Sequence, residues 1–170
     1  LAERFEPDPN DPTLWHIYLR PNLTFHDGHP VTAEDIIYTY RSVMDPDLNS
    51  PYRSEYATRI QDIRGDPNDP LHVIFQLFRP YATFLTDLVL GIVPAHVLTA
   101  QKNGMFGPEN YVGSGPFKFH SSPREDRVIL EKYDGWYHTP PQWRWLIFKT
   151  IRDENTRLLS LLALAHDPPR

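Results

Sequence analysis

Apolar and polar residues alternate along several short stretches of the chain, with the two-residue period of a half-buried β-strand. In 71–78, for example, Leu71, Val73 and Phe75 fall on one face of the predicted strand. Turn sequences rich in Pro, Gly and Asp separate such stretches, so neighbouring ones are predicted to pair as antiparallel hairpins. The strands predicted in this way are 14–19, 60–63, 71–78, 117–120, 127–132 and 145–151.

Helical spacing of apolar residues is clearest after Thr32, a residue type that favours the N-cap position. The repeat continues to Asp45-Pro46, where the proline ends the helix. Further helices are predicted from Pro80, from Pro94 to Leu98, and over 156–165 with Asn155 as the cap. Helices and strands follow one another without a regular βαβ order. The predicted fold class is therefore α+β, with mixed, largely antiparallel sheets and short helices.

Composition and charge narrow the classes of function. Lys and Arg number 17 against 22 Asp and Glu, a formal net charge of −5, and no basic stretch stands out. Nucleic acid is therefore not an expected partner. The chain has no Cys, which excludes disulfides, thiol nucleophiles and Cys-ligated zinc. Its 18 prolines indicate many short elements joined by fixed turns.

Few residue patterns in the chain point to catalysis. His26 and His29 have a spacing that could hold a metal ion, but the Asp-Gly between them favours a turn with solvated imidazoles. Gly113 and Gly115 lack the third glycine and the following helix of a nucleotide-binding loop. The chain has no Gly-x-Ser-x-Gly motif. We therefore predict that the chain is not an enzyme and that it has no catalytic residue, metal ligand or cofactor. The alternative is a metal-dependent hydrolase built on His26 and His29.

Aromatic residues make up 13% of the chain, and most are expected to fill an irregular core or an interface between domains. Tyr52 and Tyr56 differ because they lie in 47–58, a segment that is predicted to be irregular. Binding residues favour loops that a rigid scaffold holds in place. These two tyrosines are the predicted ligand-binding residues.

Short motifs follow one another along nearly the whole chain. They are Leu1–Glu6, His16–Pro21, Phe25–Asp35, Asp45-Pro46, Ser50–Tyr52, Ile92–Leu98, Gly113–Lys118, Asp126–Glu131, Trp136-Tyr137 and Thr156–Leu159. In type and order they resemble the motifs of the family 5 extracellular solute-binding proteins. This family comprises the dipeptide-, oligopeptide- and nickel-binding components of ABC importers.

The resemblance implies a two-lobed Venus-flytrap receptor of the periplasmic-binding-protein type II fold, which closes over a ligand. Residues 1–170 are expected to form part of its first lobe. About 25–112 would be a smaller accessory subdomain, the remainder would be strands and helices of the core lobe, and the second lobe would be absent.

The function that the resemblance implies is capture of di- or oligopeptides for transport across the cytoplasmic membrane. The implied partners are a peptide ligand and the membrane permease subunits of the importer. The implied location is the periplasm or another extracytoplasmic space, with a lipoprotein anchor in the full-length form.

The segment 156–165 is apolar on nearly every side, because its five leucines leave hardly any polar face. A surface helix carries a narrower apolar stripe. This helix is therefore expected to be buried in the whole receptor, and to associate with another copy or a neighbour where it is uncovered. A protein-interaction module is accordingly a further alternative function.

Overall fold

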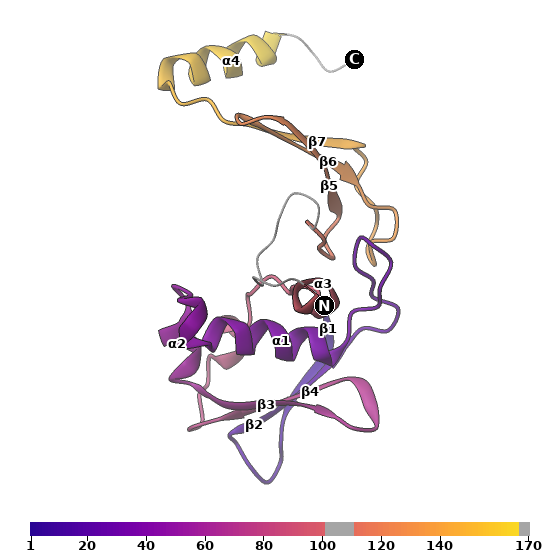
Figure 1. Ribbon diagram of the computed structural model, residues 1–170, viewed down its shortest axis with the longest axis vertical. Coiled ribbons are helices and arrows are strands. Elements are labelled where there is room, and N and C mark those ends of the chain that lie inside the picture. Colours follow the sequence, from indigo (N-terminus) through magenta and orange to yellow (C-terminus); the bar gives the residue numbers. More distant parts are fainter. Residues whose placement is uncertain (101–110, 167–170) are drawn as a thin grey trace.

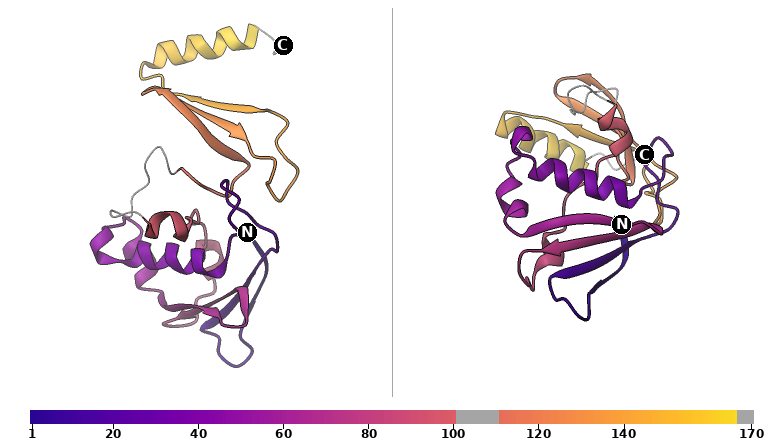
Figure 2. Two further views of the ribbon diagram at one scale, coloured as in Figure 1. Left: turned by 45° about the vertical axis from the view of Figure 1, so that its right-hand side comes forward. Right: turned by 60° about the horizontal axis from the view of Figure 1, so that its bottom comes forward.

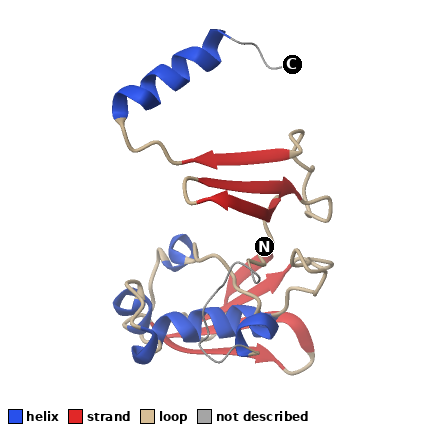
Figure 3. Cartoon of the chain, turned by 45° about the horizontal axis from the view of Figure 1, so that its top comes forward, coloured by secondary structure: helices blue, strands red, loops and turns tan. Residues whose placement is uncertain are grey.

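The computed structural model describes residues 1–100 and 111–166, which form two units at opposite ends of an elongated molecule (Figure 1). The first unit, residues 1–100, holds an antiparallel sheet with helices on one face. The second unit, residues 111–166, holds a smaller antiparallel sheet and a longer helix (Figures 2 and 3). The predicted α+β class is confirmed. No helix in these two units has the length and apolar character needed to span a membrane.

The sheet of the first unit consists of β1 (Ala2–Pro7), β2 (Leu14–Leu19), β3 (Ile60–Asp66) and β4 (Asp69–Leu77), in the order β1-β2-β4-β3. The strands predicted at 14–19, 60–63 and 71–78 are confirmed. The sequence does not predict β1, because five of the six residues in this edge strand are exposed and show no apolar alternation. β1 and β2 precede residue 25, so the sheet extends beyond the predicted accessory subdomain of about 25–112.

The helices of the first unit lie on one face of this sheet (Figure 1). The helix predicted after Thr32 is confirmed as α1 (Ala33–Met44). The segment 47–58 is less irregular than predicted, because it contains α2 (Arg53–Ala57) behind a 3₁₀ turn, η1 (Pro46–Leu48). α3 (Ala95–Thr99) follows Pro94 as predicted. The helix expected from Pro80 is only a 3₁₀ turn, η2 (Phe84–Asp87), which the buried ring of Phe84 fixes to the core.

The second unit is made of β5 (Phe117–Arg124), β6 (Arg127–Lys132), β7 (Trp145–Lys149) and α4 (Glu154–His166). The predicted hairpin and final strand are confirmed as the sheet β5-β6-β7. The prediction that Asn155 caps α4 is wrong. The cap is Asp153, whose carboxylate accepts hydrogen bonds from the backbone N–H and the hydroxyl of Thr156, at 2.7 and 2.6 Å. These bonds hold the pKa of Asp153 below its usual value.

The main core of the first unit lies between α1 and the sheet. The Tyr40 ring of α1 meets Phe75 of β4 and Tyr56 of α2 edge to face, with centroids 5.3 Å apart in both pairs. Burial raises the pKa of Tyr40. The other buried members of this core are Ile17, Leu19, Ala33, Ile36, Ile60, Ile63, Val73, Leu77 and Phe84. One contiguous core therefore joins α1, α2 and η2 to strands β2, β3 and β4.

The buried carboxylate of Asp35 ties the start of α1 to the start of α3. Oδ2 of Asp35 accepts hydrogen bonds from the backbone N–H of Thr32 (2.9 Å) and from its hydroxyl (3.2 Å). Oδ1 of Asp35 accepts from the backbone N–H of Ala95 at the start of α3 (2.9 Å). One turn along α1, the Thr39 hydroxyl accepts from the N–H of Val93 (3.0 Å). Polar groups of α1 thus hold the start of α1 and the segment that leads into α3.

The two units meet at a tight turn in 23–30, where Gly28 has a φ of +89° that favours glycine. The backbone N–H of His26 donates to the carbonyl of Gly113 (2.8 Å). Nδ1 of His26 accepts from the N–H of Gly113 (3.2 Å), and Nε2 therefore carries the proton that bonds to the carbonyl of Gly115 (3.0 Å). Burial lowers the pKa of His26. A neutral imidazole thus joins the first unit to the strand entry of the second.

A tyrosine of the second unit completes this junction. The hydroxyl of Tyr133 donates to the carbonyl of Phe25 (2.9 Å) and bonds to the hydroxyl of Thr24 (2.8 Å), and its ring meets His26 edge to face. A Cβ at Gly135 would lie 2.6 Å from the end of the Tyr133 ring. The missing side chain at Gly135 therefore leaves room for the pose in which Tyr133 reaches the turn.

Replacement of Asp35 by alanine is expected to lower the free energy of unfolding by about 2–3 kcal/mol, because it leaves the N–H groups of Thr32 and Ala95 without acceptors. The matched control is Glu34→Ala, the exposed neighbouring carboxylate, with an expected change below about 0.5 kcal/mol. Urea denaturation followed by tryptophan fluorescence measures both variants. Equal losses in the two would contradict the role assigned to Asp35.

Tyr133→Phe is expected to speed hydrogen exchange at the backbone amide of His26, because the junction loses both bonds of the hydroxyl. Gly135→Ala is expected to act in the same direction by displacing the ring of Tyr133. Gly91→Ala is the control, since a Cβ at that position meets no atom within 4 Å. Exchange rates at His26 that match the unmodified protein in both junction variants would show that Tyr133 does not hold the turn.

Candidate functional site

The two tyrosines predicted to bind ligand have different environments. Tyr52 immediately precedes α2 and is 55% exposed. Tyr56, within α2, is only 3% exposed, and its hydroxyl donates to the carbonyl of Asp87 at 2.7 Å. Burial raises the pKa of Tyr56. Tyr52 therefore has the accessibility that a ligand contact needs, whereas Tyr56 contributes to the core; the ligand-binding role of both remains a prediction.

His26 and His29 do not converge on one site, which corrects the alternative of a hydrolase built on this pair. Both ring nitrogens of His26 are used by Gly113 and Gly115 at the junction. His29 points instead toward Asp27 and stacks on His96, with ring centroids 4.0 Å apart. The Asp-Gly turn reverses the chain between the two histidines, so their side chains serve different surfaces.

Asp27, His29 and His96 form a cluster on the surface of the first unit. Oδ2 of Asp27 lies 2.7 Å from Nε2 of His96 and 3.3 Å from Nδ1 of His29. Burial opposes ionisation of Asp27, but hydrogen bonds from the His96 ring and the His29 backbone outweigh it and hold the pKa of Asp27 below its usual value. Sequence spacing gives no sign of this cluster, because His96 is brought to the turn only by the packing of α3.

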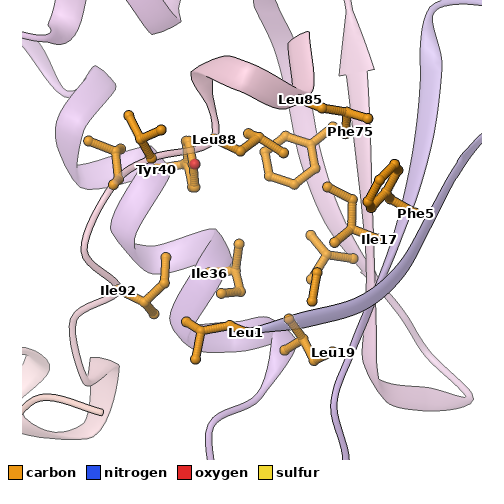
Figure 4. A pocket seen from close by; sticks show the side chains of 14 residues that line it. Leu1, Phe5, Ile17, Leu19, Ile36, Tyr40, Phe75, Leu85, Leu88 and Ile92 are labelled. Carbon is orange, nitrogen blue, oxygen red and sulfur yellow. The ribbon is translucent and has the colours of Figure 1, made fainter. Parts of the chain in front are cut away.

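An apolar hollow of about 450 Å³ lies between α1 and the sheet (Figure 4). Its walls come from β1, β2, α1, β4 and the segment 85–92, and among their side chains only that of Tyr40 carries a hydrogen-bonding group. The lining residues are Leu1, Ala2, Phe5, Ile17, Leu19, Ile36, Tyr40, Val73, Phe75, Leu85, Leu88, Val89, Leu90 and Ile92. Such a lining can bury apolar groups, but it cannot satisfy the polar backbone of a peptide.

The second unit leaves large apolar side chains uncovered. Among residues 111–163, whose exposure is described, none is buried. Ile147 and Phe148 of β7 are 55% and 56% exposed, and Leu158 and Leu162 of α4 are 55% and 54% exposed. The sheet and helix of the second unit therefore have no buried core of their own. The exposed apolar side chains of β7 and α4 are available for packing against other protein.

Comparison with known proteins finds relatives of one family along nearly the whole chain. The sequence profile of the bacterial extracellular solute-binding proteins, family 5 (middle region), matches residues 1–165. The periplasmic oligopeptide-binding protein OppA of Escherichia coli is 40% identical over 142 residues, which are 74% of this chain and 26% of OppA. Protein XP55 of Streptomyces lividans is 34% identical over 146 residues, which are 84% of this chain and 26% of XP55. The chain thus spans about a quarter of the length of these relatives.

Comparison with solved structures leads to the same family as comparison of sequences. The crystal structure of OppAIV, a periplasmic oligopeptide-binding protein of an oligopeptide ABC transporter from Borrelia burgdorferi, superimposes with a TM-score of 0.85 at 26% identity. The superposition covers 96% of this chain and 36% of the Borrelia protein, and so includes both units. Since the family profile covers all but the last few residues and the fold matches over both units, the chain belongs to family 5 of the bacterial extracellular solute-binding proteins.

Proposed function

We propose that this chain is part of the substrate-binding component of an ABC importer, which captures di- or oligopeptides outside the cytoplasmic membrane. The observation that carries the proposal is the family match over residues 1–165, together with the 40% identity to the oligopeptide-binding OppA of E. coli. In this proposal the chain binds and presents a ligand to the permease subunits, performs no catalysis, and belongs to a receptor that a lipoprotein anchor holds at the membrane.

The contrast between the two units supports a role as part of a first lobe. The first unit buries a core of apolar residues, whereas the second unit has exposed apolar residues on β7 and α4. β5 and β7 are the outer strands of the second sheet, and no strand among residues 1–100 and 111–166 pairs with their outer edges, so further strands could pair there. A larger lobe built onto this sheet would cover those faces and edges, as the size of the relatives suggests.

A peptide ligand sets requirements that this chain meets only in part. Its termini and backbone amides need hydrogen-bond partners, because buried polar groups without partners cost more than they gain. The side chains of the apolar hollow offer only the hydroxyl of Tyr40, so the hollow is not the proposed peptide site. We place the ligand contact of this chain at the exposed ring of Tyr52, and the remaining partners in the parts of the receptor that close over the ligand.

Isothermal titration calorimetry with mixed di- to pentapeptides is expected to show tight binding by the whole receptor and weak or no binding by residues 1–170 alone. Within the whole receptor, Tyr52→Ala is expected to weaken binding roughly tenfold, as loss of an aromatic contact does. Phe78→Ala, which removes another exposed ring from the first unit, is the control. Sub-micromolar binding by the isolated chain would contradict the proposal that it holds part of a site.

We also propose that α4 mediates self-association when its apolar residues are not covered. Leu158, Leu159, Leu161 and Leu162 are each between 54% and 66% exposed, which places a contiguous apolar surface on the helix. Removal of such a surface from water is favourable at roughly 25 cal/mol per Å². A second copy of the same helix offers the complementary surface.

Sedimentation velocity of residues 1–170 is expected to show oligomers that dissociate when Leu158 and Leu162 are both replaced by glutamate. The charges would lie in the centre of the apolar surface, where burial of an unpaired carboxylate is unfavourable. Leu48→Glu is the control, because Leu48 is 51% exposed but belongs to η1 in the first unit. A clean monomer at all concentrations of the unmodified chain would refute self-association.

A further inference from the structure

We propose that Asp27, His29 and His96 form a binding site for one zinc-like divalent cation. The ligand atoms of these three residues all lie within 4.8 Å of one another. Zinc binds imidazole nitrogen at about 2.0–2.1 Å and carboxylate oxygen at about 2.0–2.2 Å, so tetrahedral ligands lie roughly 3.4 Å apart. Oδ2 of Asp27 is already close to that spacing, at 3.3 Å from Nδ1 of His29 and 2.7 Å from Nε2 of His96.

The type of the ligands selects the class of cation. Two imidazoles and one carboxylate suit zinc and neighbouring transition metals, whereas magnesium and calcium prefer oxygen ligands alone. Three protein ligands leave one tetrahedral position open for water or another donor. A hollow of about 210 Å³ adjoins the cluster, and both His29 and His96 line it together with Glu34. The ion would therefore have room for a fourth, exchangeable ligand.

The ligands come from two elements that other contacts already hold in place. Asp27 and His29 lie on the turn, where Oδ1 of Asp27 accepts from the N–H of His29 (3.0 Å) and leaves Oδ2 facing the two rings. His96 lies on α3, which the bond from Ala95 to Asp35 anchors to α1. Preorganisation of this kind lowers the entropic cost of binding, because few side-chain rotations remain to be fixed.

Accessibility separates this cluster from a buried polar network. The side chains of Asp27, His29 and His96 are 26%, 60% and 33% exposed, so an ion from solution can reach them without opening the core. An ion held here would link the turn to α3. Since the same turn bonds to Gly113 and Gly115 through His26, the ion would also stabilise the junction between the two units.

Isothermal titration calorimetry of the tag-free, chelator-treated protein with ZnCl₂ tests the site. We expect one equivalent of Zn²⁺ to bind, no comparable binding of Mg²⁺, and a rise in melting temperature of roughly 5 °C at saturating Zn²⁺. His96→Gln and His29→Gln are each expected to weaken Zn²⁺ binding roughly tenfold or more. His138→Gln removes an exposed histidine of the second unit and serves as the control.

The controls separate loss of the zinc site from loss of the fold. Circular dichroism and the melting temperature of the metal-free variants show whether they fold; if His96→Gln does not, the 60% exposed His29 provides the independent test. The proposal is overturned if Zn²⁺ does not bind, if it binds unchanged in the His29 variant, or if Mg²⁺ binds equally well. Loss of binding in His138→Gln alone would place the ion elsewhere and overturn it too. None of these outcomes depends on whether the protein binds peptides.

Discussion

The buried carboxylate of Asp35 is the interaction on which the arrangement of the first unit depends. Its two oxygens serve Thr32, at the start of α1, and Ala95, at the start of α3, after the chain has passed through α2, β3 and β4. A single side chain therefore closes the path of the chain around the core. α3 carries His96, and the turn of 23–30 leads directly into Thr32. The geometry of the cluster of Asp27, His29 and His96, and that of the junction between the units, therefore depends on this carboxylate.

Elements with a local signal could be predicted from the sequence. α1 has an N-cap, an apolar repeat and a terminating proline, so the sequence predicts it with nearly correct bounds. β4 has apolar residues at every second position from Leu71 to Leu77, which predicts a strand even though Ile74 interrupts the polar face. β1 lacked a signal because an exposed edge strand is specified by its partner β2 rather than by its own residues. The cap of α4 was misplaced because Asp153 and Asn155 are equally suitable cap residues, and only the position of the first helical turn decides between them.

Site residues were harder to predict, since they depend on contacts between distant segments. The sequence shows that Tyr52 and Tyr56 are close along the chain, but the short helix α2 turns one of them into the core and leaves the other exposed. The spacing of His26 and His29 suggested a pair, and the turn separates them. His96 becomes a neighbour of His29 only because α3 packs against α1, and no local sequence pattern predicts that packing. The proposed function comes from the family resemblance, because the chemistry of single residues does not indicate one.

The strand order β1-β2-β4-β3 also determines how the chain folds. β3 and β4 are joined by a short turn at Asp66–Asp69, so this hairpin closes locally and quickly. β2 must pair with β4 across a long loop, in a register that places Leu14 opposite Gln76. The entropy of closing that loop is lost before the new contacts compensate for it, so we expect β2 to dock more slowly than the hairpin closes. Until β2 docks, the hairpin of β1 and β2 is only marginally stable, and Ile17 and Leu19, which the folded core buries, stay exposed to water and to other unfolded chains.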